Sequence, residues 1–225
     1  MTNPRAATPK TIGLSADLHE YMLAHSTPLS PVHHELIAAT AVLGPVAGMQ
    51  IAPEQGAFMT MLTRVLGVRM AVEVGTFTGY SSLCIAQGLG AGGRLLCCDV
   101  SEEWTSIARE HWHRAGVADR IDLRIAPALD TLRSLPSDSH IDLAFIDADK
   151  PNYPNYFDEI FPRLSPAGVL LVDNVLWGGR VLSADANDEQ TTAIRAFNRK
   201  VVDDPRVECV MLPISDGLTM IRRVN

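Results

Sequence analysis

Two short stretches of the sequence, "AFIDADK" and "LLVDNV", place oxygen-bearing side chains directly after an apolar run. These polar residues are Asp147, Asp149, Asp173 and Asn174. Carboxylate and amide oxygens are preferred by hard divalent cations such as Mg²⁺, Ca²⁺ or Mn²⁺, whereas Zn²⁺ favours His and Cys. We therefore interpret Asp147, Asp173 and Asn174 as candidate metal ligands. The alternative is that these side chains only cap helices or line turns.

Lys150 follows Asp147 by three residues in the same stretch. An ammonium group beside a bound cation and a reacting hydroxyl is suited to remove a proton, because neighbouring positive charges lower its pKa. Lys150 and Asp147 are therefore the candidate catalytic residues. A solvated surface lysine is the alternative interpretation of Lys150.

The stretch "EVGTFTGYS" indicates a strand, a glycine turn and the start of a helix. Gly75 lets a ligand approach the backbone, and Thr78 can cap the helix. A dinucleotide loop would have the pattern G-x-G-x-x-G, with the pyrophosphate at the helix N-terminus. Here Glu73 adds a negative charge, which favours a cationic adenosyl ligand over NAD. Alternatively, Glu73 is a buried acid in an ion pair.

Asp99 ends a further apolar run, 24 residues after Gly75. An acid at this position can accept hydrogen bonds from both ribose hydroxyls of a nucleoside, in NAD sites and adenosylmethionine sites alike. The spacing by itself does not separate the two ligands. Capping of the next helix is the alternative role, although Ser101 could also do this.

The elements that carry these residues are short apolar runs separated by helical patterns of roughly a dozen residues, as in parallel sheets covered by helices. The runs are residues 70–75, 94–100, 121–126, 141–148 and 168–174. Two further runs joined by Asp216-Gly217 indicate an antiparallel hairpin. The pattern predicts a doubly wound α/β fold with a seven-stranded, mostly parallel sheet. Such sheets bind ligands beyond the carboxyl ends of their strands, where each candidate residue is expected.

The N-terminal part has a different pattern. Residues 1–13 are expected to form a flexible tail, and two helical patterns follow between 15 and 43. Ser15 or Asp17 can cap the first helix, and Ser30 before Pro31 suits the start of the second. A third helix is expected to end at Gly67. We expect one domain over residues 14–225, with helices over 14–67 forming a lid and an α/β core over 68–225.

Composition excludes some classes of function. The chain has 225 residues, 47 % of them hydrophobic, and a net charge of −7. A negative chain without a basic stripe is a poor match for nucleic acid. No apolar run reaches the ~18 residues of a membrane span, and the N-terminus lacks the apolar stretch of a secretory signal. A cytoplasmic location is the expectation.

Cysteine and histidine chemistry is not expected. Four cysteines lie in apolar segments without C-x-x-C spacing, which is typical of buried free thiols; they are Cys84, Cys97, Cys98 and Cys209. The seven histidines form no ligand pattern. His33 and His34 are expected to be solvated helix residues, and the alternative is that they face the cleft.

With these motifs the chain resembles the class I adenosylmethionine-dependent methyltransferases, specifically the cation-dependent O-methyltransferases that include caffeoyl-CoA O-methyltransferase and, more distantly, catechol O-methyltransferase. The similarity extends from about Leu14 to Arg223 and includes the segments "APEQGAF", "EVGTFTGYS", "CCDVS", "FIDADKPNYPNYF" and "LVDNVLWGG".

The resemblance implies S-adenosylmethionine (SAM) and a divalent cation as cofactors, with Mg²⁺ the expected ion and Ca²⁺ or Mn²⁺ the alternatives. It also implies a homodimer and a small-molecule acceptor. Asp147, Asp173 and Asn174 would be the metal ligands, Lys150 the catalytic lysine, and Trp177 a wall of the acceptor pocket beside Lys150. The residues that would contact SAM are Met49, Ile51, Glu73, Gly75, Thr76, Tyr80, Ser81, Asp99, Val100, Ala128, Asp147 and Asp149.

One departure bears on the acceptor. Gly178 stands where the plant enzymes carry an asparagine that contacts substrate, and few N-terminal basic residues are available for a CoA moiety. We therefore expect methyl transfer to a hydroxyl of a small ortho-dihydroxy aromatic, chelated by the metal. The competing hypotheses are a NAD-dependent oxidoreductase of similar topology and a non-catalytic binding protein that keeps the fold.

Overall fold

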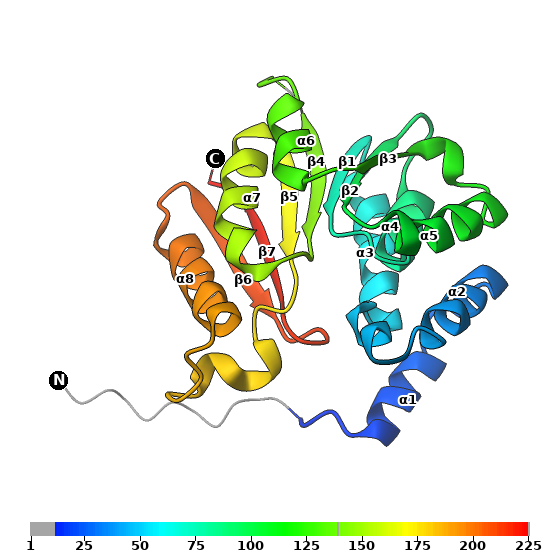
Figure 1. The fold of residues 1–225 in the computed structure, drawn as a ribbon, viewed down its shortest axis with the longest axis horizontal. Coiled ribbons are helices and arrows are strands. Elements are labelled where there is room, and N and C mark those ends of the chain that lie inside the picture. Colours follow the sequence, from blue (N-terminus) through cyan, green and yellow to red (C-terminus); the bar gives the residue numbers. More distant parts are fainter. Residues whose placement is uncertain (1–11, 139, 225) are drawn as a thin grey trace.

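The structure is a computed structural model that describes residues 12–138 and 140–224. The tail predicted over residues 1–13 lies almost entirely outside these residues. The described chain forms a central sheet with helices on both faces, as Figure 1 shows. The predicted doubly wound α/β fold is therefore confirmed.

Seven strands form the sheet in the order β3-β2-β1-β4-β5-β7-β6. Neighbouring strands from β3 to β5 pair in parallel, and β7 is antiparallel to both β5 and β6. The strands are β1 Met70–Val74, β2 Arg94–Asp99, β3 Ile121–Ile125, β4 Ile141–Ile146, β5 Leu164–Val172, β6 Val207–Leu212 and β7 Leu218–Arg223. The predicted C-terminal hairpin is thus present, and β5 begins before the predicted start at residue 168.

The strand register brings the candidate residues to one edge. Four residues near the carboxyl ends of neighbouring parallel strands lie in one row across the sheet: Val74, Cys98, Ile146 and Val172. The residues that follow them are Gly75, Asp99, Asp147 and Asp173. Because the strands are parallel and in register, these four residues lie side by side at the carboxyl edge of the sheet, where Asp99 is still the last residue of β2 and pairs with Ile125.

Helices cover both faces of the sheet, in keeping with strands that are apolar on both sides. Side chains of α3, α4 and α5 pack on one face, and those of α6, α7 and α8 pack on the other (Figure 1). The helices are α1 Ala16–Ala24, α2 Pro31–Ala41, α3 Pro53–Leu66, α4 Tyr80–Gly88, α5 Glu102–Arg114, α6 Ala128–Ser134, α7 Tyr153–Ile160 and α8 Glu189–Asp203. Short 3₁₀ turns include η1 Gly44–Met49, η3 Lys150–Asn152 and η5 Trp177–Leu182.

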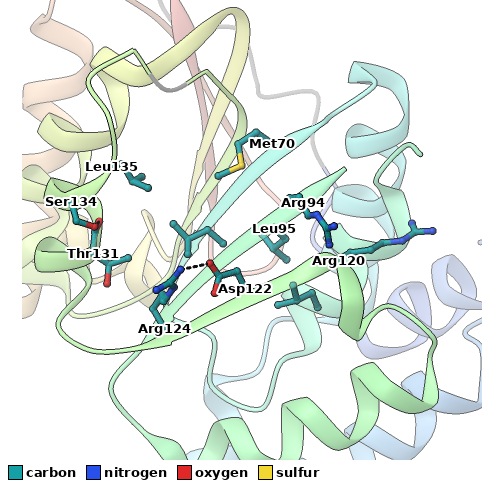
Figure 2. Close-up of a pocket in the computed structure, with 11 residues that line it drawn as sticks. Met70, Arg94, Leu95, Arg120, Asp122, Arg124, Thr131, Ser134 and Leu135 are labelled. Atoms are coloured by element: carbon teal, nitrogen blue, oxygen red, sulfur yellow. Dashed lines mark hydrogen bonds and ion pairs between the residues drawn. The ribbon is translucent and has the colours of Figure 1, made fainter. Parts of the chain in front are cut away.

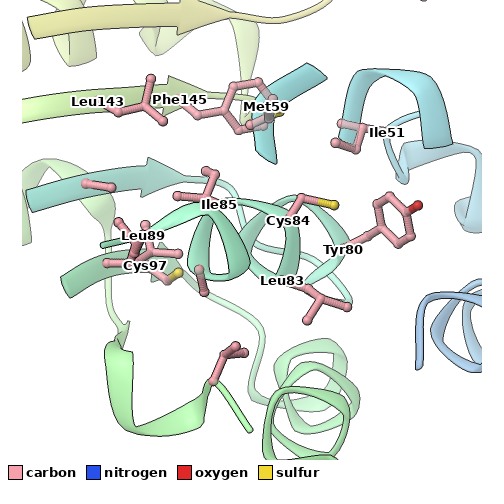
Figure 3. Close-up of a cluster of buried hydrophobic side chains, with 14 of the residues drawn as sticks. Ile51, Met59, Tyr80, Leu83, Cys84, Ile85, Leu89, Cys97, Leu143 and Phe145 are labelled. Atoms are coloured by element: carbon pink, nitrogen blue, oxygen red, sulfur yellow. The ribbon is translucent and has the colours of Figure 1, made fainter. Parts of the chain in front are cut away.

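The core on the α3–α5 side is formed by side chains from helices and strands that are distant in the sequence. Figure 3 shows Met59 of α3 and Ile85 of α4 with Leu143 and Phe145 of β4. All four side chains are fully buried. Burying a side chain of this size contributes roughly 1.5–3 kcal/mol, so α3 is held firmly against the sheet from which the site residues emerge.

Most helix boundaries follow the predicted capping residues. The Ser15 hydroxyl accepts the Leu18 N–H at the start of α1, and Gly67 ends α3 with a left-handed φ of 62°. Thr78 was predicted to cap α4, but Gly79 occupies that position. The Thr78 hydroxyl instead accepts a hydrogen bond of 2.8 Å from Thr40 of α2. The prediction failed because a long-range partner competes for the threonine.

Two further expectations were wrong in part. His33 is buried, not solvated, and its ring packs edge-on against Tyr80. Burial and the neighbouring His34 lower the pKa of His33. Three cysteines are buried as expected, but Cys209 is exposed because β6 is an edge strand of the sheet.

Candidate active site

A large cavity lies at the carboxyl ends of the parallel strands. Its volume is about 930 Å³, which is within the usual range for small-molecule sites. Fifteen of the sixteen residues singled out from the sequence line it: Met49, Ile51, Gly75, Thr76, Tyr80, Ser81, Asp99, Val100, Ala128, Asp147, Asp149, Lys150, Asp173, Asn174 and Trp177. The fold therefore gathers, in one cavity, residues that are up to 128 positions apart in the sequence.

The turn after β1 is held by the carboxylate at the end of β2. Asp99 Oδ2 accepts the N–H groups of Thr76 and Phe77 at 2.9 and 2.8 Å. Its Oδ1 accepts the N–H of Ser101 at 2.8 Å. Ser101, in turn, caps α5 through Trp104 N–H. Asp99 does not cap this helix itself; it shapes the glycine turn and keeps a carboxylate at the cavity wall.

The packing of the chain requires a glycine at position 75, whether or not a ligand is bound. Its φ is +90°, and a Cβ atom there would collide with the backbone carbonyl oxygen of Asp147. The turn after β1 therefore packs directly on the start of the loop after β4. This contact brings the turn after β1 next to the residues that follow β4.

Glu73 is the singled-out residue that does not line the cavity. Its side chain is fully buried, and burial raises the pKa of its carboxyl group to about 7. The group lies among the hydroxyls of Thr76, Ser81 and Ser82, although neither of its oxygens has a hydrogen-bond partner among the described residues. Glu73 thus lies beneath the turn, on the side of α4.

Lys150 lies at the centre of a buried polar cluster. Its Nζ donates to Asn174 Oδ1 and Tyr153 OH at 2.6 Å each, and to Asp147 Oδ1 at 3.0 Å. The Trp177 ring centroid is 5.7 Å from the same nitrogen. An ammonium group has three N–H donors, so the three oxygens match its capacity. The lysine is an interior residue, and the solvated alternative is excluded.

Tyr153 was not anticipated as part of this cluster. Burial, and then the negative charge of Asp147, raise the pKa of Tyr153 well above its usual range. The phenol therefore keeps its proton and donates it to the backbone carbonyl of Asp173 at 3.2 Å. Its position three residues after Lys150, on the same helical turn, was the signal in the sequence that could have identified it.

Asp173 is almost completely buried and is held from two directions. Its Oδ1 accepts the N–H of Asn174 at 2.7 Å, and its Oδ2 accepts Nε2 of Gln55 at 2.8 Å. Burial, and then the charge of Asp147, raise the pKa of the Asp173 carboxyl group. Asn174 itself has a left-handed φ of 56°, a conformation that asparagine tolerates.

These residues fit a hard divalent cation. Oxygens of Asp147 and Asn174 already converge on one positive charge, that of Lys150, and Asp173 adds a second buried carboxylate beside them. Among the described residues, no three or more His, Cys, Asp or Glu side chains gather as a metal site. The candidate set has two carboxylates and one amide, which is oxygen chemistry suited to Mg²⁺ rather than to Zn²⁺.

Asp149 is held by two partners from the segment that follows it. Its oxygens accept Tyr156 OH and Asn152 Nδ2, each at 2.5 Å. Burial, and then the hydrogen bond to Asp149, raise the pKa of Tyr156. Asp149 therefore faces the cavity as a fixed carboxylate.

The wall beyond Lys150 is a tight loop. Trp177, Gly178 and Gly179 all have positive φ values, of 50°, 55° and 79°. Asp216 Oδ1, from the β6–β7 hairpin, accepts the Gly178 N–H at 2.6 Å. Asp216 lines the cavity together with Ser215 and Gln190. The sequence placed Asp216 only in the hairpin turn and assigned none of the three to the site.

A second cavity, of about 620 Å³, lies near the amino ends of β1, β2 and β3. Figure 2 shows its three arginines, Arg94, Arg120 and Arg124. Each of them forms a hydrogen bond or an ion pair with another residue of the chain. Arg124 pairs with Asp122 at 2.7 Å, Arg120 donates to the carbonyls of Ala86 and Leu89, and Arg94 donates to that of Asp119. None of the singled-out residues lines this cavity.

Solved structures with the same fold define the class. The O-methyltransferase of Bacillus cereus in complex with SAH superimposes with a TM-score of 0.85 and 31% identity, over 92% of this chain and 97% of that one. TomG from Streptomyces achromogenes, in complex with SAM, gives a TM-score of 0.85 and 26% identity, over 93% and 96%. The fold is that of the class I methyltransferases.

The sequence comparisons identify the family. The model of the O-methyltransferase family matches residues 23–224. Probable caffeoyl-CoA O-methyltransferase 1 of Dictyostelium discoideum is 39% identical over 209 residues, or 91% of either chain. Tricin synthase 2 of Oryza sativa subsp. japonica is 36% identical, over 96% of this chain and 78% of its own. The chain belongs to the SAM-dependent O-methyltransferase family. No described helix is long and apolar enough to cross a membrane.

Proposed function

We propose that the protein is a divalent-cation-dependent O-methyltransferase that transfers the methyl group of SAM to one hydroxyl of an ortho-dihydroxy aromatic acceptor. One observation carries this proposal. Lys150 Nζ contacts oxygens of Asp147 and Asn174 at 3.0 and 2.6 Å. These residues line the same cavity as the turn after β1, whose backbone N–H groups are bound by Asp99. The proposed nucleoside site and the proposed cation site would therefore share one wall of the cavity.

The cofactor would lie along the first turn and the loops beside it. Asp99 would hold the ribose with the lone pairs that its backbone contacts leave free. Phe77 and Trp104, which pack edge-on with centroids 5.1 Å apart, line the cavity near Val100 and Ala128 and suit a flat base. Met49 and Ile51 would cover the cofactor, and the remaining proposed contacts are Gly75, Thr76, Tyr80, Ser81, Asp147 and Asp149. Buried Glu73 would act on the cofactor only through the turn.

The reaction needs an ionised hydroxyl, and a free phenol has an ordinary pKa near 10. When bound, SAM would supply an electrophilic methyl group and the cation would supply positive charge next to the two acceptor hydroxyls. Asp147, Asp173 and Asn174 would hold that cation. Lys150 would first release one ammonium proton to solvent, which the positive charge of the cation beside it favours, and as a neutral amine it would then receive the hydroxyl proton in place of one of its present contacts. Trp177 would hold the ring in place, and this positioning lowers the barrier further.

The charged residues that line the cavity are mostly acidic, which favours a small, uncharged acceptor over one that carries phosphate groups. Among the described residues that line it, Lys150 is the one cation, and the acids are Asp99, Asp147, Asp149, Asp173 and Asp216. A CoA thioester carries several phosphate charges, which would need basic partners. Some relatives are named as caffeoyl-CoA O-methyltransferases, yet a free catechol matches this lining better.

A NAD-dependent oxidoreductase was the alternative of a different class. The relatives and solved structures reported above are methyltransferases, and the turn after β1 lacks the second glycine of a dinucleotide loop. We also propose a homodimer, on the basis of the family resemblance, and a cytoplasmic location, which was the expectation from the sequence. Light scattering of the purified protein tests the proposed homodimer, because a dimer would have twice the mass of the chain.

The first experiment is turnover with SAM and a panel of catechols, including caffeic acid and caffeoyl-CoA, measured as adenosylhomocysteine with Mg²⁺ and with EDTA. Turnover that EDTA abolishes and Mg²⁺ restores supports the proposal. Turnover that is indifferent to EDTA overturns the metal role and leaves methyl transfer standing. Without turnover, calorimetry with SAM and with NAD decides between the two cofactor classes.

A further inference from the structure

Gln55 is a fully buried polar residue to which the proposed reaction assigns no role. It lies in the first turn of α3, 118 residues before Asp173, and its Nε2 donates to Asp173 Oδ2 at 2.8 Å. This contact joins a helix of the N-terminal part to the loop after β5. The adjacent Glu54 faces the other way and contacts His19 of α1 at 3.1 Å.

Keeping this glutamine buried has an energetic cost. Its Oε1 is buried and has no hydrogen-bond partner among the described residues. A buried polar atom without a partner destabilises the fold, because it has lost its hydrogen bonds to water without replacing them. A methionine of similar size would fill the same space without that cost, so packing alone does not account for the amide.

What the amide of Gln55 contributes is a fixed orientation of the Asp173 carboxylate. Asn174 N–H fixes Oδ1, and Gln55 Nε2 fixes Oδ2, so the plane of the carboxylate is set by two donors from different elements. Without Gln55, the side chain of Asp173 would keep one anchor and could turn about its last torsion, which is broad in aspartate. Partners that orient metal-ligating side chains typically change metal affinity by about 10- to 100-fold.

We infer that Gln55 is a positioning residue that orients Asp173 toward the divalent cation, an inference that rests on the proposed metal role of Asp173. Gln55 does not line the cavity and acts through Asp173. It follows that the N-terminal helices contribute to the cation site through α3, because the hydrogen bond ends if α3 moves away from the loop after β5.

The test is Mn²⁺ binding to the cofactor-free protein, measured by calorimetry, for the wild type, Gln55→Met and Gln55→Asn. Gln87→Met is the matched control, because Gln87 lies on α4 and does not line the cavity. SAM binding without metal is measured for each protein, and it reports whether the cavity is intact. We expect Mn²⁺ affinity to fall about 10- to 100-fold in both Gln55 variants, with SAM affinity unchanged and Gln87→Met equal to the wild type.

A double variant, Gln55→Met with Asp173→Asn, separates positioning from general destabilisation. If Gln55 acts through Asp173, the double variant binds Mn²⁺ no more weakly than Asp173→Asn alone. Wild-type Mn²⁺ affinity in Gln55→Met, or loss of SAM binding in parallel with Mn²⁺ binding, overturns this inference and leaves the proposed function standing. A wild type that binds SAM but no Mn²⁺ overturns the metal part of the proposed function and this inference with it.

Discussion

Lys150 Nζ lies 2.6 Å from Asn174 Oδ1, although the two residues follow different strands of the sheet. The contact fastens the loop after β4 to the loop after β5, and Asp147 Oδ1 shares the same ammonium at 3.0 Å. The positive charge of Lys150 therefore joins the two loops, in addition to the hydrogen bond from Tyr153 OH to the Asp173 carbonyl. The cluster is sensitive to the loss of any one of Lys150, Asp147 and Asn174.

Replacement of Lys150 is expected to remove most of the activity. In Lys150→Met, the proposed proton acceptor is lost, and such groups typically contribute about 10²- to 10⁴-fold to the rate. We expect kcat to fall at least about 100-fold, with SAM affinity within a few-fold of the wild type by calorimetry. Lys200→Met is the control, because Lys200 pairs with Asp158 on α7, away from the cavity. Near-normal kcat in Lys150→Met would remove the lysine from the mechanism.

Asp99→Asn is expected to weaken the binding of SAM. The Asp99 carboxylate accepts hydrogen bonds from three backbone N–H groups. The substitution removes its negative charge and turns an NH₂ group toward some of these donors. Hydrogen bonds to charged groups contribute about 1.5–3 kcal/mol, so Kd should rise at least about 10-fold. Calorimetric titration with SAM measures this. The control is Asp122→Asn, which removes an exposed acid of β3 that pairs with Arg124; equal effects of both variants would contradict the role of Asp99.

Glu73 makes the cofactor-free protein less stable as pH rises. The pKa of its carboxyl group is about 7 in the fold and 4.5 ordinarily. Between these values the unfolded chain releases the proton while the folded chain keeps it, so rising pH favours unfolding. The penalty is complete above pH 7 and absent below pH 4.5, and the raised pKa of Asp173 acts in the same direction.

Glu73→Gln isolates this contribution. Relative to the wild type, the variant should gain about 2–3 kcal/mol in free energy of unfolding between pH 5 and pH 8. Urea denaturation in EDTA at both pH values measures the difference, and contributions from Asp173 and His33 cancel because both proteins contain them. A constant difference between the two proteins at pH 5 and pH 8 would show that the carboxyl group is already ionised in the fold.

Gly75→Ala and Gly116→Ala compare two left-handed glycines, with φ values of 90° and 68°. At Gly75 a methyl group would collide with the Asp147 backbone, whereas nothing lies within 4 Å of a Cβ at Gly116. We expect Gly116→Ala to cost about 1–2 kcal/mol of stability, from backbone strain alone. Gly75→Ala should cost clearly more and also weaken SAM binding. Thermal unfolding and calorimetry check both, and similar costs would show that the collision is relieved by a small shift of the loop.

Several parts of the fold and site could be predicted from local pattern. Continuous apolar runs indicate strands buried on both faces, and the last residue of each run marks a strand end. In a parallel sheet those ends share one edge, so Asp99, Asp147 and Asp173 could be placed together without coordinates. Capping by Ser15 and the left-handed Gly67 followed from residue type in the same way.

Glu73 could have been placed better from the sequence. Side chains alternate across a strand, and Val72 and Val74 pack on the α6–α8 side of the sheet. Glu73 therefore points to the other face, beneath α4, and not into the cavity beyond the strand end. The alternation was visible in "VEV", but the direction of the first helix crossing decides which face is which.

The sequence by itself determined the class of fold, the strand ends and the residue types at the cavity, because these depend on periodicity and on neighbours along the chain. Only the tertiary structure decided which distant groups meet. Gln55 donates a hydrogen bond to Asp173, 118 positions later in the sequence. The hydroxyl of Thr40 donates to the hydroxyl of Thr78, and the ring of His33 is buried against Tyr80. Each of these contacts depends on how α2 packs on α4 and α5 and how α3 packs on α4 and the sheet, and that packing is set by the whole core rather than by any single segment.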